Sequence, residues 1–107
     1  DMIITGGFNV YSVEVEQGVS SIDGVSGVAV FGVPSEKWGE EVKAVVQLDQ
    51  GASLSADEII STCKDRMGSV KAPKSVDFVS VLPKTSLGKI DKKMIRDQYW
   101  KDAGRVI

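Results

Sequence analysis

One short apolar run, residues 27–33, constrains the fold of this chain more than any other segment. Its sequence, Gly-Val-Ala-Val-Phe-Gly-Val, is apolar on both alternating faces and rich in β-branched residues, which is typical of a strand in the middle of a sheet. Residues 42–48 alternate more cleanly between apolar and polar side chains. Residues 76–82 form another apolar run, so we expect three central strands.

Three helices are expected to accompany these strands. Ser12, Ser55 and Asp91 each stand where a side chain can cap the first backbone N–H groups of a helix. Gly68 is expected to end the second helix. The Val-Glu-Val-Glu alternation after Ser12 would also suit a strand, but we predict a helix there. The expected inward residues are Val15, Val19 and Ile22 in the first helix, Ile59, Ile60, Cys63 and Met67 in the second, and Met94, Ile95 and Tyr99 in the third.

The start of the chain predicts a separate small hairpin. Residues 2–5 and 9–11 are short strand-like segments on either side of the paired glycines Gly6 and Gly7. Residues 34–41, between the first two central strands, are predicted to form a polar loop. The element order therefore predicts an α+β domain: a small N-terminal β-hairpin followed by a three-stranded sheet with helices packed on it.

Composition bounds the class of protein. With 107 residues the chain is long enough for one domain with its own core, and the 42% hydrophobic content is that of a soluble globular protein. A formal net charge of −2 argues against a nucleic-acid partner. Residues 71–101 are locally basic, which suits a small anionic ligand. No apolar run is long enough for a transmembrane segment.

Two residue counts exclude several kinds of chemistry. The chain has no histidine, so Ser-His and Cys-His nucleophiles are excluded and no metal site is predicted. Cys63 is the only cysteine, which rules out an internal disulfide and favours a reducing, cytoplasmic location. The chain opens at Asp1 inside an apolar segment, so we expect residues 1–107 to be a domain of a longer polypeptide.

A polar turn near the end is the leading candidate for a binding site. The segment Pro-Lys-Thr-Ser-Leu-Gly-Lys, residues 83–89, places Lys89 directly behind Gly88. Such a turn can present one mobile cation to an anionic ligand, although by itself it is more typical of a solvated surface turn. Lys71 and Lys74 occupy another loop, where a solvated position suits both side chains. Trp38 is expected to pack its loop against the sheet rather than to perform chemistry.

Three blocks of sequence together resemble one family. They are Asp-Met-Ile-Ile-Thr-Gly-Gly-Phe-Asn-Val-Tyr-Ser-Val-Glu-Val-Glu at residues 1–16, Gly-Val-Pro-Ser-Glu-Lys-Trp-Gly-Glu at 32–40, and the turn at 83–89. In this order and spacing they are similar to the C-terminal domain of the AMP-forming acyl-CoA synthetases, a superfamily that includes peptide-synthetase adenylation domains and firefly luciferase.

The resemblance implies a two-step ligase. A carboxylic acid, here expected to be a fatty or similar apolar acid, reacts with ATP to give an acyl-adenylate, and coenzyme A then displaces AMP. The C-terminal domain is a mobile lid that presents a different face in each step. Its partner is the N-terminal domain of the same polypeptide, which holds the ATP, its Mg²⁺ and the acid, so this chain by itself is expected to be inactive.

The resemblance also implies roles for individual residues. Lys89 would enter the site for adenylation and hold the carboxylate and the α-phosphate, with Gly88 allowing its close approach. Gly6 and Gly7 would line the path of the pantetheine arm in the thioester step. Lys71 and Lys74 would help to bind the nucleotide of coenzyme A. Asp1 lies at the hinge between the domains or one residue past it.

Two alternatives stay open on the sequence. The acceptor could be the phosphopantetheine of a carrier protein instead of free coenzyme A, or the chain could be a non-catalytic nucleotide-binding module. Retention of Gly6, Gly7 and Lys89 argues against the second alternative, because a binding module does not need elements specific to both steps. Ser12 departs from the proline that many relatives carry, but a serine can start the same helix.

Overall fold

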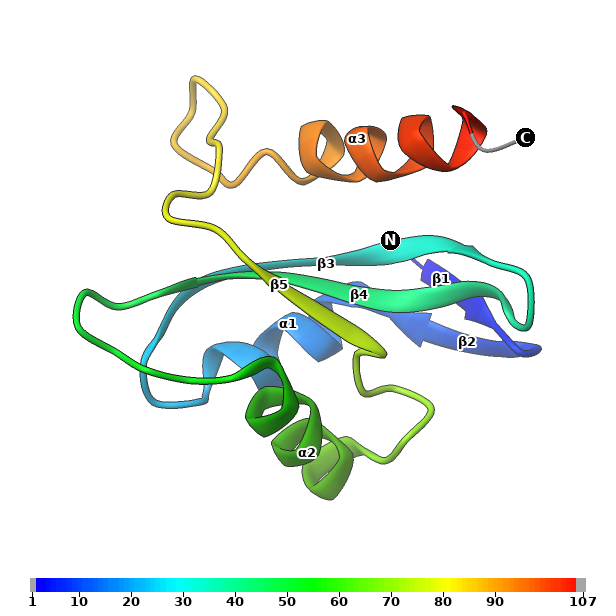
Figure 1. Ribbon diagram of the computed structural model, residues 1–107, viewed down its shortest axis with the longest axis horizontal. Helices are drawn as coiled ribbons and strands as arrows, with labels where there is room; N and C mark the ends of the chain where they lie inside the picture. Colours follow the sequence, from blue (N-terminus) through cyan, green and yellow to red (C-terminus); the bar gives the residue numbers. More distant parts are fainter. Residues whose placement is uncertain (1, 106–107) are drawn as a thin grey trace.

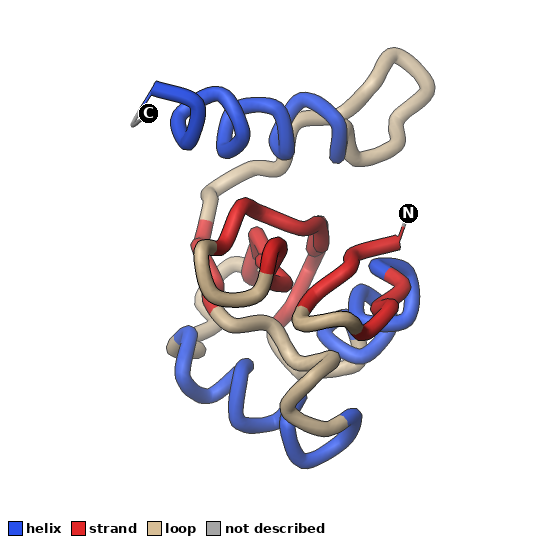
Figure 2. The backbone as a smooth tube through the Cα atoms, turned by 90° about the vertical axis from the view of Figure 1, so that its right-hand side faces the viewer, coloured by secondary structure: helices blue, strands red, loops and turns tan. Residues whose placement is uncertain are grey.

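The computed structural model describes residues 2–105, with side chains described as far as residue 101, and Asp1 therefore lies outside it. It confirms an α+β fold. Five strands form one mixed sheet, with α1 and α2 on one face and α3 on the other (Figures 1 and 2). In chain order the elements are β1 (Met2–Thr5), β2 (Phe8–Tyr11), α1 (Ser12–Ser20), β3 (Val25–Ser35), β4 (Gly39–Leu48), α2 (Ala56–Met67), β5 (Ser75–Phe78) and α3 (Lys92–Arg105).

The long β3–β4 hairpin forms most of the sheet. β4 lies inside it, with β3 on one side and β1 and β5 on the other, so the prediction of a central strand at residues 27–33 needs correction: β3 is an edge strand. The two strands pair antiparallel from Ser35 opposite Gly39 to Val25 opposite Leu48, with one irregularity after Val25. The polar loop predicted for residues 34–41 is therefore wrong, because both strands continue through it and only residues 36–38 form the turn. Backbone pairing satisfies the N–H and C=O groups there whatever the polarity of the side chains.

The sequence-based prediction of a third central strand at residues 76–82 needs correction. β5 covers only Ser75–Phe78, runs parallel to β4 and lies at the edge of the sheet. α2 provides the crossover that such a parallel pair requires. Beyond β5 the chain leaves the sheet: Val81 is 70% exposed, whereas Leu82 is buried among residues that face α3.

The N-terminal hairpin is joined to the sheet more loosely. β1 and β2 pair along their whole length, but β1 pairs with β4 only through Thr5 opposite Gly39. Ile4 N–H adds a hydrogen bond of 3.0 Å to Glu40 Oε1. The hairpin therefore projects from the end of the sheet, beside the β3–β4 turn (Figure 1).

The alternation of β3 and β4 divides the core into two clusters, one on each face of the sheet. Val28 and Val30 lie in the cluster against α1 and α2, and Ala29 and Phe31 lie in the cluster against α3. Cys63 of α2 is buried in the first cluster, and this burial raises the pKa of its thiol. The prediction that Cys63 is an apolar core residue is confirmed.

Of the predicted N-caps of α1 and α2, one is confirmed and the other is wrong. Ser55 forms a complete capping box with Glu58 at the start of α2, and Gly68 follows the helix with φ of 87°. The predicted cap at Ser12 is wrong: Tyr11 is the N-cap of α1, and Ser12 is a fully buried first residue. Its hydroxyl instead accepts a hydrogen bond from the side chain of Lys92.

At α3, the predicted cap is confirmed and one predicted inward residue is not. The Asp91 side chain accepts from Met94 N–H at 3.1 Å. Ile95 and Tyr99 pack toward the sheet, but Met94 is 50% exposed. One residue along a helix turns the side chain by about 100°, so Met94 and Ile95 cannot share the narrow inward stripe.

Polar contacts hold the far part of α3 to the sheet. Tyr99 donates a hydrogen bond to the carboxylate of Asp77 on β5, and Lys43 on β4 lies 3.0 Å from the same oxygen. The hydrogen bond from Tyr99 lowers the pKa of Asp77, with a further contribution from Lys43. Burial is the main cause that raises the pKa of Tyr99. Trp100 Nε1 donates to the Gly32 carbonyl at 2.8 Å.

We predict that Tyr99→Phe lowers stability most at neutral pH. The depressed pKa of Asp77 favours its ionised form in the folded state. It therefore contributes stability above the ordinary carboxyl pKa of about 4, and that contribution is lost as the pH falls through the lowered value. Loss of the Tyr99 donor moves the pKa of Asp77 back toward its usual range. Denaturant unfolding from about pH 7 to pH 2 should show the difference between the two proteins shrinking in acid. A difference independent of pH would contradict this assignment.

Candidate functional site

The turn that carries Lys89 is a compact structure held by its own backbone. Thr85 N–H donates to the Lys89 carbonyl at 2.7 Å, Gly88 N–H donates to the Thr85 carbonyl at 2.9 Å, and Lys84 forms an isolated β-bridge with Ile90. Gly88 has φ of 83°, a value that favours glycine at this point. The turn stands clear of the sheet at one end of the molecule (Figure 1).

Lys89 is available for a ligand. Its side chain is exposed, and among the side chains described no carboxylate lies within ion-pair distance of its ammonium. The base of the turn is nonetheless fixed: Leu82 is buried, Ile90 packs against the α3-side cluster, and Asp91 N–H donates to the Pro83 carbonyl at 2.8 Å. The structure thus places a free cation on an anchored support.

The two glycines of the N-terminal hairpin have different surroundings. Gly6 has φ of 57°, donates its N–H to the Trp38 carbonyl at 2.9 Å, and packs so closely that a Cβ there would lie 2.8 Å from Trp38 Cε3. Gly7 has φ of 83°, and a Cβ there would meet nothing within 4 Å. Gly6 is therefore required by the fold, whereas Gly7 borders open space.

A cavity of about 220 Å³ lies beside this hairpin. Gly6 and Trp38 form part of its wall, and Lys74 lines it from the loop after α2. The Lys74 ammonium donates to the Ser69 carbonyl at 2.6 Å, which holds the loop together. The remaining lining residues are Thr5, Phe8, Ser69 and Val70.

Lys71, Lys74 and Trp38 are placed differently from one another. Lys71 forms an ion pair of 3.0 Å with Glu14 on α1 and does not line the cavity, so the structure does not bring it together with Lys74. Trp38 is 40% exposed: its ring lies against Gly6, with the Lys37 ammonium 4.8 Å from the ring centroid. The apolar wall formed by Phe8, Trp38 and Val70 was not predicted, because it joins three segments that are distant in the sequence.

The Lys89 turn and the Gly6-Gly7 hairpin do not form one site. In Figure 1 the turn lies at the upper left, before the start of α3, and the hairpin lies at the right, beside the β3–β4 turn. No group of three His, Cys, Asp or Glu side chains within residues 2–101 could hold a metal ion. Across the part of the chain that the structure describes, no helix is long and apolar enough to cross a membrane.

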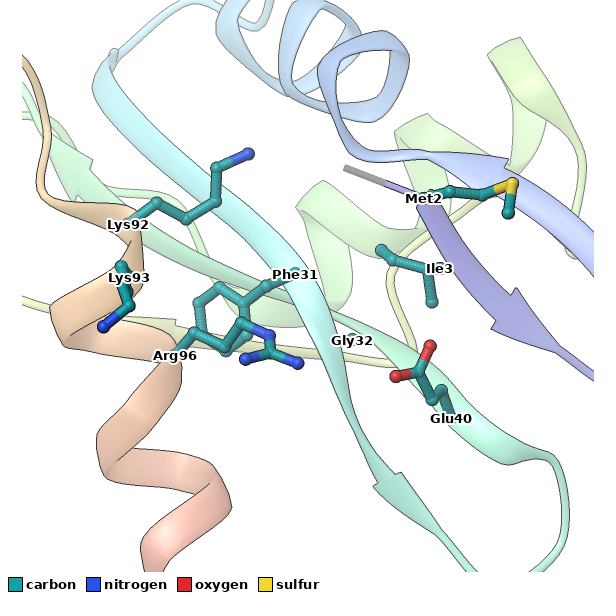
Figure 3. Close-up of a pocket in the computed structure, with 8 residues that line it drawn as sticks. All are labelled: Met2, Ile3, Phe31, Gly32, Glu40, Lys92, Lys93 and Arg96. Carbon is teal, nitrogen blue, oxygen red and sulfur yellow. The ribbon is translucent and has the colours of Figure 1, made fainter.

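A second cavity, of about 350 Å³, lies between the start of α3 and the edge of β1 (Figure 3). Phe31 and Gly32 of β3 form its floor, and the side chain of Arg96 reaches across it. Lys92 also borders this cavity, but its ammonium points away toward α1. The contacts of Lys92 were not predicted, because its hydrogen-bond partner Ser12 is 80 residues away in the chain.

Comparison of the sequence with known proteins identifies one family. The sequence profile described as AMP-binding enzyme C-terminal domain matches residues 14–89. A medium/long-chain-fatty-acid–CoA ligase of Mycobacterium tuberculosis is 48% identical over 114 residues, covering 100% of this chain and 20% of that protein. A feruloyl-CoA synthase of Amycolatopsis sp is 43% identical, covering 92% of this chain and 20% of its own length.

The fold is also found in solved structures. The structure of a Mycobacterium tuberculosis fatty acyl CoA synthetase superposes with a TM-score of 0.86 at 44% identity, covering 95% of this chain and 20% of that one. The chain thus spans about a fifth of the length of the proteins that it matches.

We predict that Gly6→Ala destabilises the fold more than Gly7→Ala. Both substitutions place alanine at positive φ, which costs roughly 1–2 kcal/mol. Only Gly6→Ala also pushes a methyl group into the Trp38 ring, adding about 1–3 kcal/mol of overpacking. Free energies of unfolding from urea titrations should show this order, and the difference should shrink in a Trp38→Ala background. Equal losses for the two variants would mean that the ring moves aside freely.

Proposed function

The chain belongs to the family of AMP-binding enzyme C-terminal domains, and on that premise we propose that it is the lid domain of an AMP-forming acyl-CoA synthetase. The lid acts with a larger N-terminal domain of the same polypeptide, which binds ATP and a carboxylic acid. Support for a fatty acid comes from relatives described as fatty-acid–CoA ligases. Such an ATP- and CoA-dependent ligase would work in the cytoplasm.

The observation that carries the proposal is the separation of two ligand-facing elements. The first step needs a cation beside the acid and the α-phosphate, and the second step needs a channel for a thiol arm. This domain carries an exposed lysine, with no ion pair among the described side chains, on one side and a glycine hairpin with an adjoining cavity on the other. One active site can use both only in turn, so the lid rotates between the steps.

Lys89 acts in the first step. A carboxylate oxygen of the acid attacks the α-phosphorus of ATP, the bond from that phosphorus to the β-phosphate oxygen breaks, and pyrophosphate leaves. The Lys89 ammonium bridges the two anions that must meet and offsets the charge that builds on them. Because none of the described carboxylates pairs with it, its charge is available to the transition state. Gly88 keeps the turn tight beneath it.

The hairpin acts in the second step. The thiolate of coenzyme A attacks the acyl carbonyl, and AMP leaves. Gly7 leaves room for the pantetheine arm, and the cavity beside Gly6 and Trp38 gives that arm an apolar wall. Lys74 lies at this cavity, where it can meet a phosphate of coenzyme A, whereas Lys71 is already paired with Glu14. The phosphopantetheine of a carrier protein also carries a phosphate, so it stays an alternative acceptor.

The Mg²⁺ that accompanies ATP would be held outside this domain. The residues described here offer no carboxylate cluster that fits a metal ion. Every contribution that we assign to this chain is made by a cation, a backbone position or an apolar surface.

We predict that Lys89→Ala, in the polypeptide that joins this domain to its N-terminal partner, lowers ATP–pyrophosphate exchange about 10²–10³-fold. With decanoate as the acid, conversion of supplied decanoyl-adenylate to decanoyl-CoA should stay near normal. Lys64→Ala, which removes an exposed lysine from α2, is the matched control and should leave both steps unchanged. Equal losses in the two steps for Lys89→Ala would refute its assigned role.

We also predict that Gly7→Leu slows thioester formation on the order of 10–100-fold, because a misplaced arm loses its alignment with the carbonyl. Adenylation should be much less affected. Gly51→Leu is a matched control, since Gly51 also has φ of 83° and open space around its Cβ position but lies in the turn before α2. Rates of decanoyl-CoA formation from supplied decanoyl-adenylate check this. The channel assignment fails if the two leucine variants behave alike.

A further inference from the structure

Lys92 is the first residue of α3 and lies three positions after Lys89. Its ammonium is directed away from solvent: Nζ lies 3.0 Å from Glu16 Oε2 and donates to Ser12 Oγ at 3.0 Å. Figure 3 shows its side chain running from α3 toward α1. Lys92 and Glu16 are only 22% and 21% exposed, so this ion pair is screened much less than a surface pair.

Glu16 connects this ion pair to the sheet. The same oxygen, Oε2, accepts the backbone N–H of Val30 at 2.9 Å. Val30 belongs to β3, which pairs with β4 and lies at the end of the strand order. One carboxylate of α1 therefore holds both the sheet and the start of α3 through charge-assisted hydrogen bonds.

The position of Lys89 depends on the start of α3. The hydrogen bonds within the turn fix its shape but not its orientation relative to the sheet. Leu82 and Ile90 anchor the base of the turn through apolar contacts, which have little directionality. Leu82 N–H also donates to Gln47 Oε1 on β4 at 2.8 Å, which fixes the side where the chain enters the turn. The polar contacts of Tyr99 and Trp100 lie two turns farther along α3. The Lys92–Glu16 pair is the directional side-chain contact on the other side, where the chain leaves the turn after Lys89.

We propose that Lys92 is a positioning residue for adenylation: by binding Glu16 and Ser12, it holds the start of α3, and hence the Lys89 ammonium, at the correct place. Lys92 does not itself touch ATP or the acid. The inference rests on the function proposed above. The Gly6-Gly7 hairpin has independent attachments through Trp38 and Glu40, so loss of Lys92 affects the thioester step far less.

The first test is Lys92→Met in the full polypeptide, with decanoate and ATP. Because remote misplacement of a reacting group by about 1 Å can cost up to 10²-fold, we expect kcat for pyrophosphate exchange to fall about tenfold. The KM for ATP should stay within twofold, and the rate from supplied decanoyl-adenylate should be unchanged. Lys92→Arg, which keeps the charge and the donors, should recover most of the exchange rate.

Lys93→Met is the matched control. Lys93 is adjacent, carries the same charge and is 87% exposed, with a surface ion pair to Asp97 at 3.5 Å. It should leave exchange unchanged. A similar fall for Lys93→Met would show that overall charge rather than position matters. No rescue by Lys92→Arg would show that a cationic donor at this position does not hold Lys89 in place. Either result would overturn the proposal.

Glu16→Gln is a second, independent variant. It removes the charge that pairs with Lys92 but keeps an oxygen that can accept from Val30 N–H. It should reduce exchange selectively, and the double variant with Lys92→Met should be no slower than Lys92→Met alone, because the two residues act as a pair. The Glu16→Gln variant alone tests the positioning role if Lys92→Met does not fold.

Two outcomes separate this inference from the proposed function. If Lys89→Ala abolishes exchange while Lys92→Met and Glu16→Gln do not reduce it, the positioning role fails and the function stands. If Lys89→Ala itself leaves exchange intact, both fail. If Lys92→Met slows the two half-reactions equally, Lys92 contributes only to the general stability of the domain. That result would also overturn the proposal.

Discussion

The central constraint on this structure is that the β3–β4 hairpin is apolar on both faces. A two-sided apolar sheet is stable in water only when both faces are covered. α1 and α2 cover one face and α3 covers the other, which gives the three layers of Figure 2. The chain must therefore cross from one face to the other after β5, and the segment that does so contains the Lys89 turn. The location of the proposed adenylation lysine follows from the need to cover the second face.

Features encoded within one segment could be predicted from the sequence. The capping box of α2 involves Ser55 and Glu58, three residues apart, and the terminating Gly68 is next to the helix. The alternation of residues 42–48 likewise predicted which side chains share a face, since Val42, Ala44 and Val46 all lie in the cluster against α1 and α2. These predictions succeeded because local chemistry and the global fold agree there.

Features that depend on distant partners could not be predicted. Ser12 has the chemistry of a cap, but Lys92 binds its hydroxyl from the other end of the chain. The third strand was placed too centrally, because an apolar run does not reveal which edge it will join or that Leu82 leaves the sheet for the α3-side cluster. The cavity beside Gly6 and Trp38 needed three separate segments to meet. For Lys89, the resemblance to a family supplied what its local turn could not.

The outer edge of β3 has a consequence for how this domain behaves among other molecules. An 11-residue apolar strand with an open edge is a template on which another chain can add a strand and begin to aggregate. Here the Glu16 carboxylate accepts a hydrogen bond from the N–H of Val30, and the Trp100 indole donates one to the carbonyl of Gly32. These side chains interrupt the backbone ladder that an incoming strand would need. The mobile lid proposed above could therefore expose this edge to a crowded cell without polymerising through it.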